Sequence, residues 1–202
     1  MMADNCNANI ILAEPFMSRK DKHPHLAYDN LLQILLGHKL TVDLQIFDNE
    51  ASAEYKRFIK IKWNANYQLV PPNKHQINAY KRAICMFKAH FLAILAGVAQ
   101  DFPRNLWDLL LPQTELTLNF LRKATLDPSI SAWSYFHGSF NCDATPIGPL
   151  SCNIIAHKKT GKRHSWDFRG ADIWNVGVAL QHYWCRTIVT KHTHKRPKSQ
   201  TQ

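Results

Sequence analysis

Asp48 and Asn49 directly follow residues 42–47, in which apolar and polar side chains alternate as they do in a β-strand. In α/β domains, the side chains that carry out chemistry gather at the carboxyl ends of strands. Asp48 stands at such a position. Asp and Asn are also favoured in strand-to-helix turns, where their side chains hydrogen-bond to the backbone. Taken alone, Asp48-Asn49 is more typical of a strand-to-helix turn than of a catalytic site. A catalytic role for Asp48 therefore depends on the rest of the sequence.

Positive charge is concentrated near the C-terminal end of the sequence. Residues 157–202 carry a formal charge of +8 out of the +10 of the whole chain. The cations are Lys158, Lys159, Lys162, Arg163, Arg169, Arg186, Lys191, Lys195, Arg196 and Lys198. A basic segment of this kind favours a polyanionic partner, most often nucleic acid. A solvated basic tail without a partner has the same composition, so charge leaves both interpretations open.

Large aromatic residues are interleaved with these cations, among them Trp166, Trp174 and Tyr183. Their rings could stack on bases while the cations contact phosphates. The alternative is that the rings form the core of a small β-domain, and we expect this for most of them.

The elements that must position these residues alternate between strands and helices. We expect strands near 9–13, 42–47 and 67–70, helices near 26–36, 55–63, 77–96 and 105–123, and short β-hairpins from 145 to 189. Pro112 should kink or split the last helix. This order predicts an α/β domain.

Several short motifs, in their order along the chain, resemble those of a known protein family. They are FDNEAS at 47–52, QLVPPNKH at 68–75, NAYKRAI at 78–84 and FKAHF at 87–91, followed by DFP at 101–103, LWD at 106–108, TLN at 117–119, LR at 121–122, SAW at 131–133 and TPI at 145–147. In this order they resemble the integrase core of LTR retrotransposon Gag-Pol polyproteins. The resemblance implies a partial RNase H-like fold over residues 1–140, a small SH3-like β-barrel over 141–190 and a basic disordered tail over 191–202. It also implies integration of element DNA by two Mg²⁺ ions held by three carboxylates.

The resemblance assigns the catalytic positions one by one. Asp48 corresponds to the second carboxylate of the family, and Lys81 occupies the position of its Glu, with 32 residues between them. An ammonium group cannot bind Mg²⁺ and repels it. No residue corresponds to the first Asp or to the family's zinc module. We therefore expect Asp48 to be vestigial, a weak metal ligand at most, Lys81 to be inactivating, and Mg²⁺ not to be bound.

The resemblance also suggests where DNA would be contacted. Candidate residues on or before the long helix are Lys74, His75, Arg82 and Lys88, and those in the C-terminal part are Lys158, Lys159, Lys162 and Arg163. For the residues on or before the long helix, an equal alternative is that they form a basic helix face that contacts only water. A homo-oligomer is also implied, and an unpaired sheet edge would favour self-association.

No apolar run reaches the roughly 18 residues that a membrane-spanning helix needs. The first nine residues lack a secretory pattern. The five cysteines show no C-x-x-C spacing, which favours reduced thiols. We therefore expect an intracellular protein, nuclear or cytoplasmic, that is not secreted and has no membrane partner.

Three interpretations remain. The first is an N-terminally truncated, inactive integrase remnant, which the sequence favours. The second is a nucleic-acid-binding module co-opted from a retroelement. The third is an active integrase whose missing strands belong to an incomplete gene model, although truncation does not explain Lys81.

Overall fold

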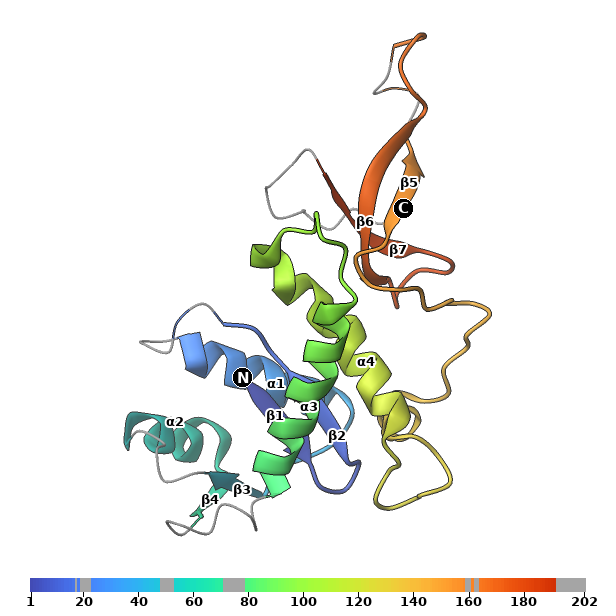
Figure 1. Cartoon of the computed structure of the whole chain (residues 1–202). Coiled ribbons are helices and arrows are strands. Elements are labelled where there is room, and N and C mark those ends of the chain that lie inside the picture. Colours follow the sequence, from blue (N-terminus) through green and yellow to red (C-terminus); the bar gives the residue numbers. More distant parts are fainter. Residues whose placement is uncertain are drawn as a thin grey trace. The chain divides into compact units, whose positions relative to one another are not determined.

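The computed structural model describes residues 1–16, 18, 23–47, 53–70, 79–158, 161 and 164–191 (Figure 1). The chain divides into two compact units. The first consists of Met1–Lys88 and Leu118–Gly138, and the second of Ala89–Thr117 and Ser139–Gln202. The two long helices α3 (Ala79–Ala96) and α4 (Leu111–Leu121) each contribute residues to both units.

A two-stranded antiparallel hairpin forms the centre of the first unit. In this hairpin β1 (Met2–Asn5) pairs with β2 (Ile10–Ala13). The Asn5 side chain accepts hydrogen bonds from the backbone N–H groups of Asn7 and Ala8, at 3.1 and 2.9 Å. This local bonding is the reason that Asn is favoured in turns, and it closes the connection between the two strands.

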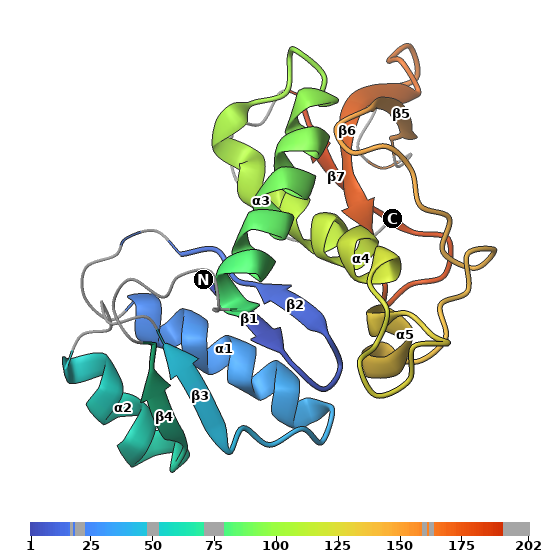
Figure 2. The ribbon, with the colours of Figure 1, turned by 60° about the horizontal axis from the view of Figure 1, so that its bottom comes forward.

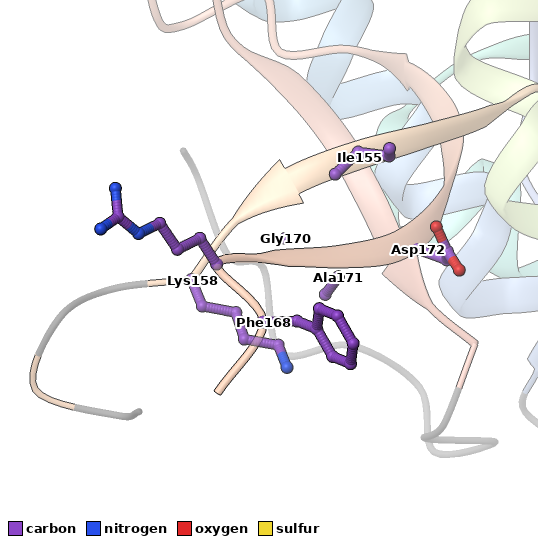
Figure 3. A pocket seen from close by; sticks show the side chains of 7 residues that line it. Ile155, Lys158, Phe168, Gly170, Ala171 and Asp172 are labelled. Atoms are coloured by element: carbon purple, nitrogen blue, oxygen red, sulfur yellow. The ribbon is translucent and has the colours of Figure 1, made fainter. Parts of the chain in front are cut away.

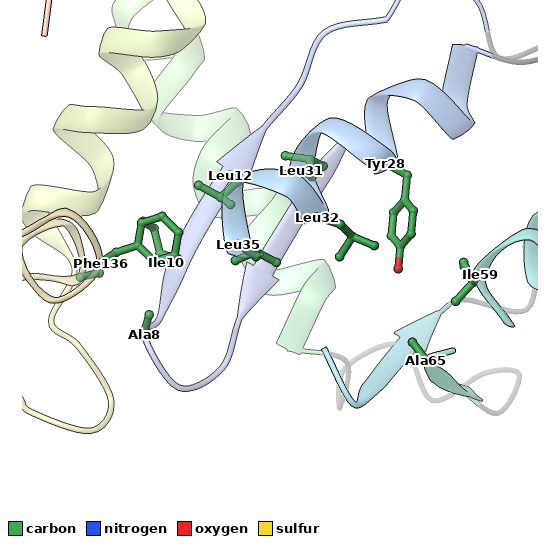
Figure 4. Packing of buried hydrophobic residues seen from close by; sticks show 11 residues of the cluster. Ala8, Ile10, Leu12, Tyr28, Leu31, Leu32, Leu35, Ile59, Ala65 and Phe136 are labelled. Atoms are coloured by element: carbon green, nitrogen blue, oxygen red, sulfur yellow. The ribbon is translucent and has the colours of Figure 1, made fainter. Parts of the chain in front are cut away.

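Helix α1 (His23–Gly37) packs against this hairpin and supplies the largest share of the core (Figures 2 and 4). Its buried side chains recur at intervals of three and four residues, as one face of a helix requires: Tyr28, Leu31, Leu32 and Leu35. The helix begins three residues before the expected position at 26. Pro24 lies in its first turn, where a missing N–H costs nothing.

The rest of this unit contains a β-α-β segment. β3 (Leu44–Phe47) and β4 (Asn66–Leu69) pair in parallel, and α2 (Ala53–Trp63) lies between them in the sequence. Ile59 of α2 is fully buried and joins the core formed by α1 and the hairpin. The Tyr28 hydroxyl on α1 donates a hydrogen bond to the Gln45 side chain on β3, which ties this segment to α1.

The outer edge of β2 is covered by side chains from the end of α4. The Asn119 amide accepts a hydrogen bond from the Ile11 N–H at 2.9 Å and donates one to the Ile11 carbonyl at 2.8 Å. Asn119 therefore takes the place that a neighbouring strand would occupy. Arg122 donates from Nε to the Asn9 carbonyl at 2.7 Å and lies 3.3 Å from an Asp4 carboxylate oxygen. Both residues blunt an edge that could otherwise pair with another chain.

The second unit contains a helical layer and a sheet. η2 (Arg104–Leu110) is a 3-10 helix interrupted by non-helical dihedral angles at Leu106, and α4 follows it directly. The expected break near Pro112 is therefore real, but it lies before the proline. Pro112 itself occupies the first turn of α4, where it is tolerated.

The sheet of this unit has the strand order β5-β6-β7 and is antiparallel throughout. Its strands are β5 (Asn153–His157), β6 (Gly170–Val178) and β7 (Arg186–Thr190), with a bulge at residues 175–177. The core side chains are Phe102, Leu106, Leu110, Leu150, Trp174, Val176 and Val189. This packing buries residues 173–177 of β6, whereas Gly170 and Ala171 are half-buried and Asp172 is exposed.

The expected strands and helices are present, and the chain is a mixed α/β protein. β1 and the short helix α5 (Ala132–His137) were not expected. The strands did not meet the expectation of a common sheet, because within the described ranges β1-β2 and β3-β4 form separate sheets. Nor does the described part of the three-stranded sheet close into a barrel. No helix in the described part of the chain is both long enough and apolar enough to cross a membrane.

Candidate nucleic-acid interface

Six of the residues that the sequence singled out lie outside the described residues: Asp48, Lys74, His75, Lys159, Lys162 and Arg163. Of the catalytic pair, only Lys81 is described, and it lies in the first turn of α3, as expected. The described residues contain no group of three or more His, Cys, Asp and Glu side chains arranged to hold a metal ion.

The remaining cations of α3 lie on two sides of that helix. Lys81 and Lys88 are separated by seven residues, which is about two turns, so they share a face. Arg82 is rotated from Lys81 by about 100°. Arg82 and Lys88 are exposed, whereas Lys81 is half-buried. The helix therefore offers dispersed positive charge rather than one convergent cluster.

The described C-terminal cations converge more closely, at the end of the hairpin where β5 is connected to β6. The register of this pair continues one step beyond the strands, because the Lys158 N–H donates to the Arg169 carbonyl at 2.8 Å. Lys158 and Arg169 are thus cross-strand neighbours, and both are exposed. Like charges placed opposite each other destabilise a hairpin. A polyanion bound at this end would relieve that repulsion.

The aromatic residues separate into two groups by burial. Trp174 is 4% exposed and belongs to the core, as we expected for most of these rings. Trp166, Phe168, Tyr183 and Trp184 are instead 99%, 89%, 75% and 63% exposed. The first two lie in the β5–β6 connection beside the paired cations. An apolar ring that remains in water loses the stabilisation that burial would provide.

Trp174, in the middle of β6, contacts two charged residues of the same unit. Its indole N–H lies 3.4 Å from one Asp101 carboxylate oxygen, and the Lys191 ammonium lies 2.7 Å from the other. Lys191 also lies 5.3 Å from the centre of the Trp174 ring, in a cation–π contact. The hydrogen bond from Lys191 holds the pKa of Asp101 below its usual value. Lys191, which we had placed at the start of the tail, is therefore engaged inside this unit.

A hollow of about 480 Å³ lies along the exposed half of the hairpin (Figure 3). Its lining residues are Ile155, Lys158, Phe168, Arg169, Gly170, Ala171 and Asp172. Their chemistry is mixed, with one aromatic ring, two aliphatic side chains, two cations and one carboxylate.

The connection that bears Trp166 and Phe168 is held by a local turn. The Asp167 carboxylate accepts a hydrogen bond from the His164 N–H at 2.9 Å, and the Asp167 N–H donates to the His164 carbonyl at 3.1 Å. These reciprocal bonds close a turn over residues 164–167, which contains Trp166.

The sequence identified one residue of this hollow, Lys158, as a nucleic-acid contact but missed the others. Arg169 was counted only as part of the basic segment, and Phe168 and Asp172 were not singled out. The available signal was their alternation, since Phe168, Gly170 and Asp172 occupy every second position.

The sequence matches no protein-family model and no curated protein.

Proposed function

We propose that the chain binds nucleic acid through the end of the β5–β6 hairpin. The observation that carries the proposal is the pairing of Lys158 with Arg169 in a connection that also bears two exposed aromatic rings, Trp166 and Phe168. Cations of this kind contact phosphates, and aromatic rings stack on bases. An acidic protein surface would satisfy the cations but would leave the rings without a specific role. Nucleic acid uses both kinds of group at once.

The proposed contacts are electrostatic in the first place. Each phosphate that a cation neutralises releases condensed counterions, so affinity falls as salt rises. The binding should therefore be weak, independent of sequence at the phosphates, and strongly dependent on salt.

We further propose that the chain derives from a retrotransposon integrase and lacks strand-transfer activity. The ordered motif series supports the origin. The β3-α2-β4 order with parallel strands, and the position of Lys81 in the first turn of the following helix, are compatible with a partial RNase H-like core. The antiparallel sheet β5-β6-β7 is compatible with part of an SH3-like module. Within this proposal the second unit keeps the nucleic-acid contacts of the ancestral enzyme.

The inactivity rests on charge. If Lys81 occupies the position of a metal-binding Glu, its ammonium would face the ion at about 4 Å. At an effective dielectric of about 20, each unit of ion charge then costs roughly 4 kcal/mol. Strand transfer with Mg²⁺ or Mn²⁺ should thus be absent in the native chain. Activity that is present there and disappears in an Asp48→Asn variant would overturn this part of the proposal.

A salt titration tests the binding proposal. Fluorescence anisotropy measures the affinity of the full chain for a labelled single-stranded oligonucleotide at several salt concentrations. Replacing Lys158 and Arg169 with Ala together should reduce the magnitude of the log–log salt slope by about 1.4, because each contact contributes about 0.7 on a single strand.

The matched control removes two cations elsewhere. Arg57 and Lys60 are exposed residues of α2 in the first unit. The Arg57→Ala, Lys60→Ala double variant changes net charge by the same amount and should keep the slope of the native chain. Equal losses in both double variants would show a general charge effect instead of a site, and absence of binding by the native chain would refute the proposal.

A further inference from the structure

We propose that the hollow on the β5–β6 hairpin is a subsite for one unpaired nucleobase, and that Asp172 selects bases carrying an exocyclic amino group. This inference rests on the proposed nucleic-acid binding and goes beyond it by naming the chemical group that is recognised. It distinguishes cytosine, adenine and guanine from thymine and uracil.

The register of the hairpin places the necessary groups on one face. Ile155 pairs directly with Asp172, so their side chains lie on the same side of the sheet. Gly170 lies two residues before Asp172 and shares that side. Phe168 lies two residues earlier again and lines the same hollow. One wall of the hollow is therefore aromatic, and a carboxylate stands further along the strand (Figure 3).

Gly170 makes room for the Ile155 side chain on this face of the hairpin. A Cβ atom built at this position would lie 2.5 Å from Cγ2 of Ile155, closer than two carbon atoms can approach. Any larger residue would push against Ile155 and fill the floor of the hollow. Phe168 and Asp172 line the same hollow, so a base that enters it can meet both side chains.

Phe168 provides a stacking surface that no described residue covers, since its side chain is 89% exposed. The Lys158 side chain runs along the same end of the hairpin (Figure 3) and can meet the phosphate attached to a stacked base. Stacking on an aromatic ring tolerates any base, because every base has a flat face. Stacking therefore supplies affinity but not selectivity.

Selectivity comes from Asp172. The ionised carboxylate only accepts hydrogen bonds. Among the described residues its side chain has no hydrogen-bond or ion-pair partner. The amino groups of cytosine, adenine and guanine donate hydrogen bonds from the base edge. Thymine and uracil instead present two carbonyl oxygens beside a single N–H, and these oxygens repel a carboxylate.

The same arrangement favours a single strand over a duplex. In a duplex, the flat faces of the bases are stacked on their neighbours and the pairing edges are occupied. A base can reach Phe168 and Asp172 together only when it is unstacked and unpaired. An acidic peptide fits the hollow less well, because Asp172 would repel it.

The test compares two labelled oligonucleotides of about 12 nucleotides, oligodeoxycytidine and oligothymidine, by fluorescence anisotropy on the full chain. The native chain should bind the cytosine oligomer about tenfold more tightly, the size expected for one good contact to a base edge. An oligoribocytidine and oligouridine pair in the same assay distinguishes RNA from DNA. The preference for cytosine should appear in whichever type of oligonucleotide, DNA or RNA, binds the chain more tightly.

Two substitutions separate the contributions of the subsite. Asp172→Asn should abolish the preference for cytosine and strengthen binding of oligothymidine, because it removes a negative charge beside the phosphates. Phe168→Ala should weaken both oligomers by roughly tenfold, whereas Phe168→Tyr should retain their binding. The charge-matched control is Asp143→Asn, since Asp143 is an exposed carboxylate in a loop of the same unit. That variant should keep the preference.

The outcomes separate this inference from the function on which it rests. If Asp172→Asn retains the preference, or Phe168→Ala binds as the native chain does, the subsite is refuted. If the Lys158 and Arg169 variants still reduce the salt slope in that case, nucleic-acid binding by the hairpin stands. If no oligonucleotide binds to the native chain, both proposals fail.

Discussion

Asn119 is the residue whose replacement should most damage the first unit. Its side chain is completely buried, and its amide makes two hydrogen bonds to the backbone of Ile11 on the outer edge of β2. Replacing it with Leu keeps most of the side-chain volume but removes the amide oxygen and the amide N–H that bond to the Ile11 backbone. The Ile11 N–H and carbonyl would then be buried and unsatisfied, because Ile11 itself is fully buried.

The expected loss of stability follows from the unsatisfied Ile11 N–H and carbonyl groups. An unsatisfied buried backbone group costs about 1–3 kcal/mol, so two of them should cost about 2–6 kcal/mol. A chain of this kind has only about 5–15 kcal/mol of stability in total. Asn119→Leu should therefore strongly lower the free energy of unfolding, and its newly unpaired strand edge should promote self-association.

Asn119→Asp tests the two hydrogen bonds separately. The carboxylate can still accept from the Ile11 N–H, but it cannot donate to the Ile11 carbonyl, and its second oxygen faces that carbonyl. Protonation restores the donor, so this variant should recover stability as pH falls through the range in which its carboxyl group titrates. The Leu variant should show no such recovery.

Urea unfolding followed by circular dichroism measures the loss, and amide hydrogen exchange at Ile11 reports the edge itself. Exchange at Ile11 should accelerate in both variants. The control is Gln33→Ala, on the exposed side of α1, which should change stability by no more than about 0.5 kcal/mol. An Asn119→Leu protein as stable as this control, with unchanged exchange at Ile11, would contradict the assigned role of Asn119.

Two further predictions concern the same unit. Arg122→Met should lower the free energy of unfolding in urea by about 3–5 kcal/mol, because it leaves the Asp4 carboxylate buried without its partner. Asp4→Asn should lower it by less. A larger loss in Asp4→Asn than in Arg122→Met would contradict this account. Partial burial of the His137 ring against neighbouring aromatic rings, with a smaller repulsion from His38, lowers the pKa of His137 to about 4. Stability should therefore fall as pH decreases from about 6.5 to 4, by at most about 1.4 kcal/mol per pH unit and by less because the residue is partly exposed. His137→Phe should flatten this part of the pH profile, and an unchanged profile would exclude His137 as its source.

The sequence predicted those elements whose own residues determine them. The apolar run at 10–13 and the alternation at 42–47 became β2 and β3, and the spacing of buried residues in 26–36 became α1. In β2 and α1 the apolar positions also mark the buried face, whereas in β3 the apolar Leu44 and Ile46 are 48% and 49% exposed. The break before α4 was also foreseeable, although its position depends on Leu106 and not on Pro112.

The elements that were missed depend on distant partners. β1 consists of four residues of which two are polar, and it is a strand because β2 pairs with it. α5 has only six residues and is stabilised by its cap, in which the Ser131 hydroxyl accepts from the Ser134 N–H at 3.0 Å. So short a helix gives too few turns for a periodic pattern to be read.

The candidate site was predicted in the same uneven way. Charge and composition pointed to the basic segment that contains Lys158, and its role in binding stays a prediction. The sequence could not show that Arg169 would be its cross-strand neighbour, because the register of a hairpin is set by pairing over its whole length. For the same reason it did not distinguish the exposed Phe168 from the buried Trp174, which lie only six residues apart.

The most direct test of the proposed interface is a photocrosslinking experiment with the full chain. A single-stranded oligonucleotide containing a photoreactive base is irradiated with the protein, and the crosslinked peptide is identified by mass spectrometry. Our account predicts that the crosslinks fall in the β5–β6 connection, at Trp166 or Phe168, and that they diminish as salt is raised. Crosslinks confined to the first unit, or none at a protein concentration that saturates binding, would contradict the claim that this hairpin contacts nucleic acid.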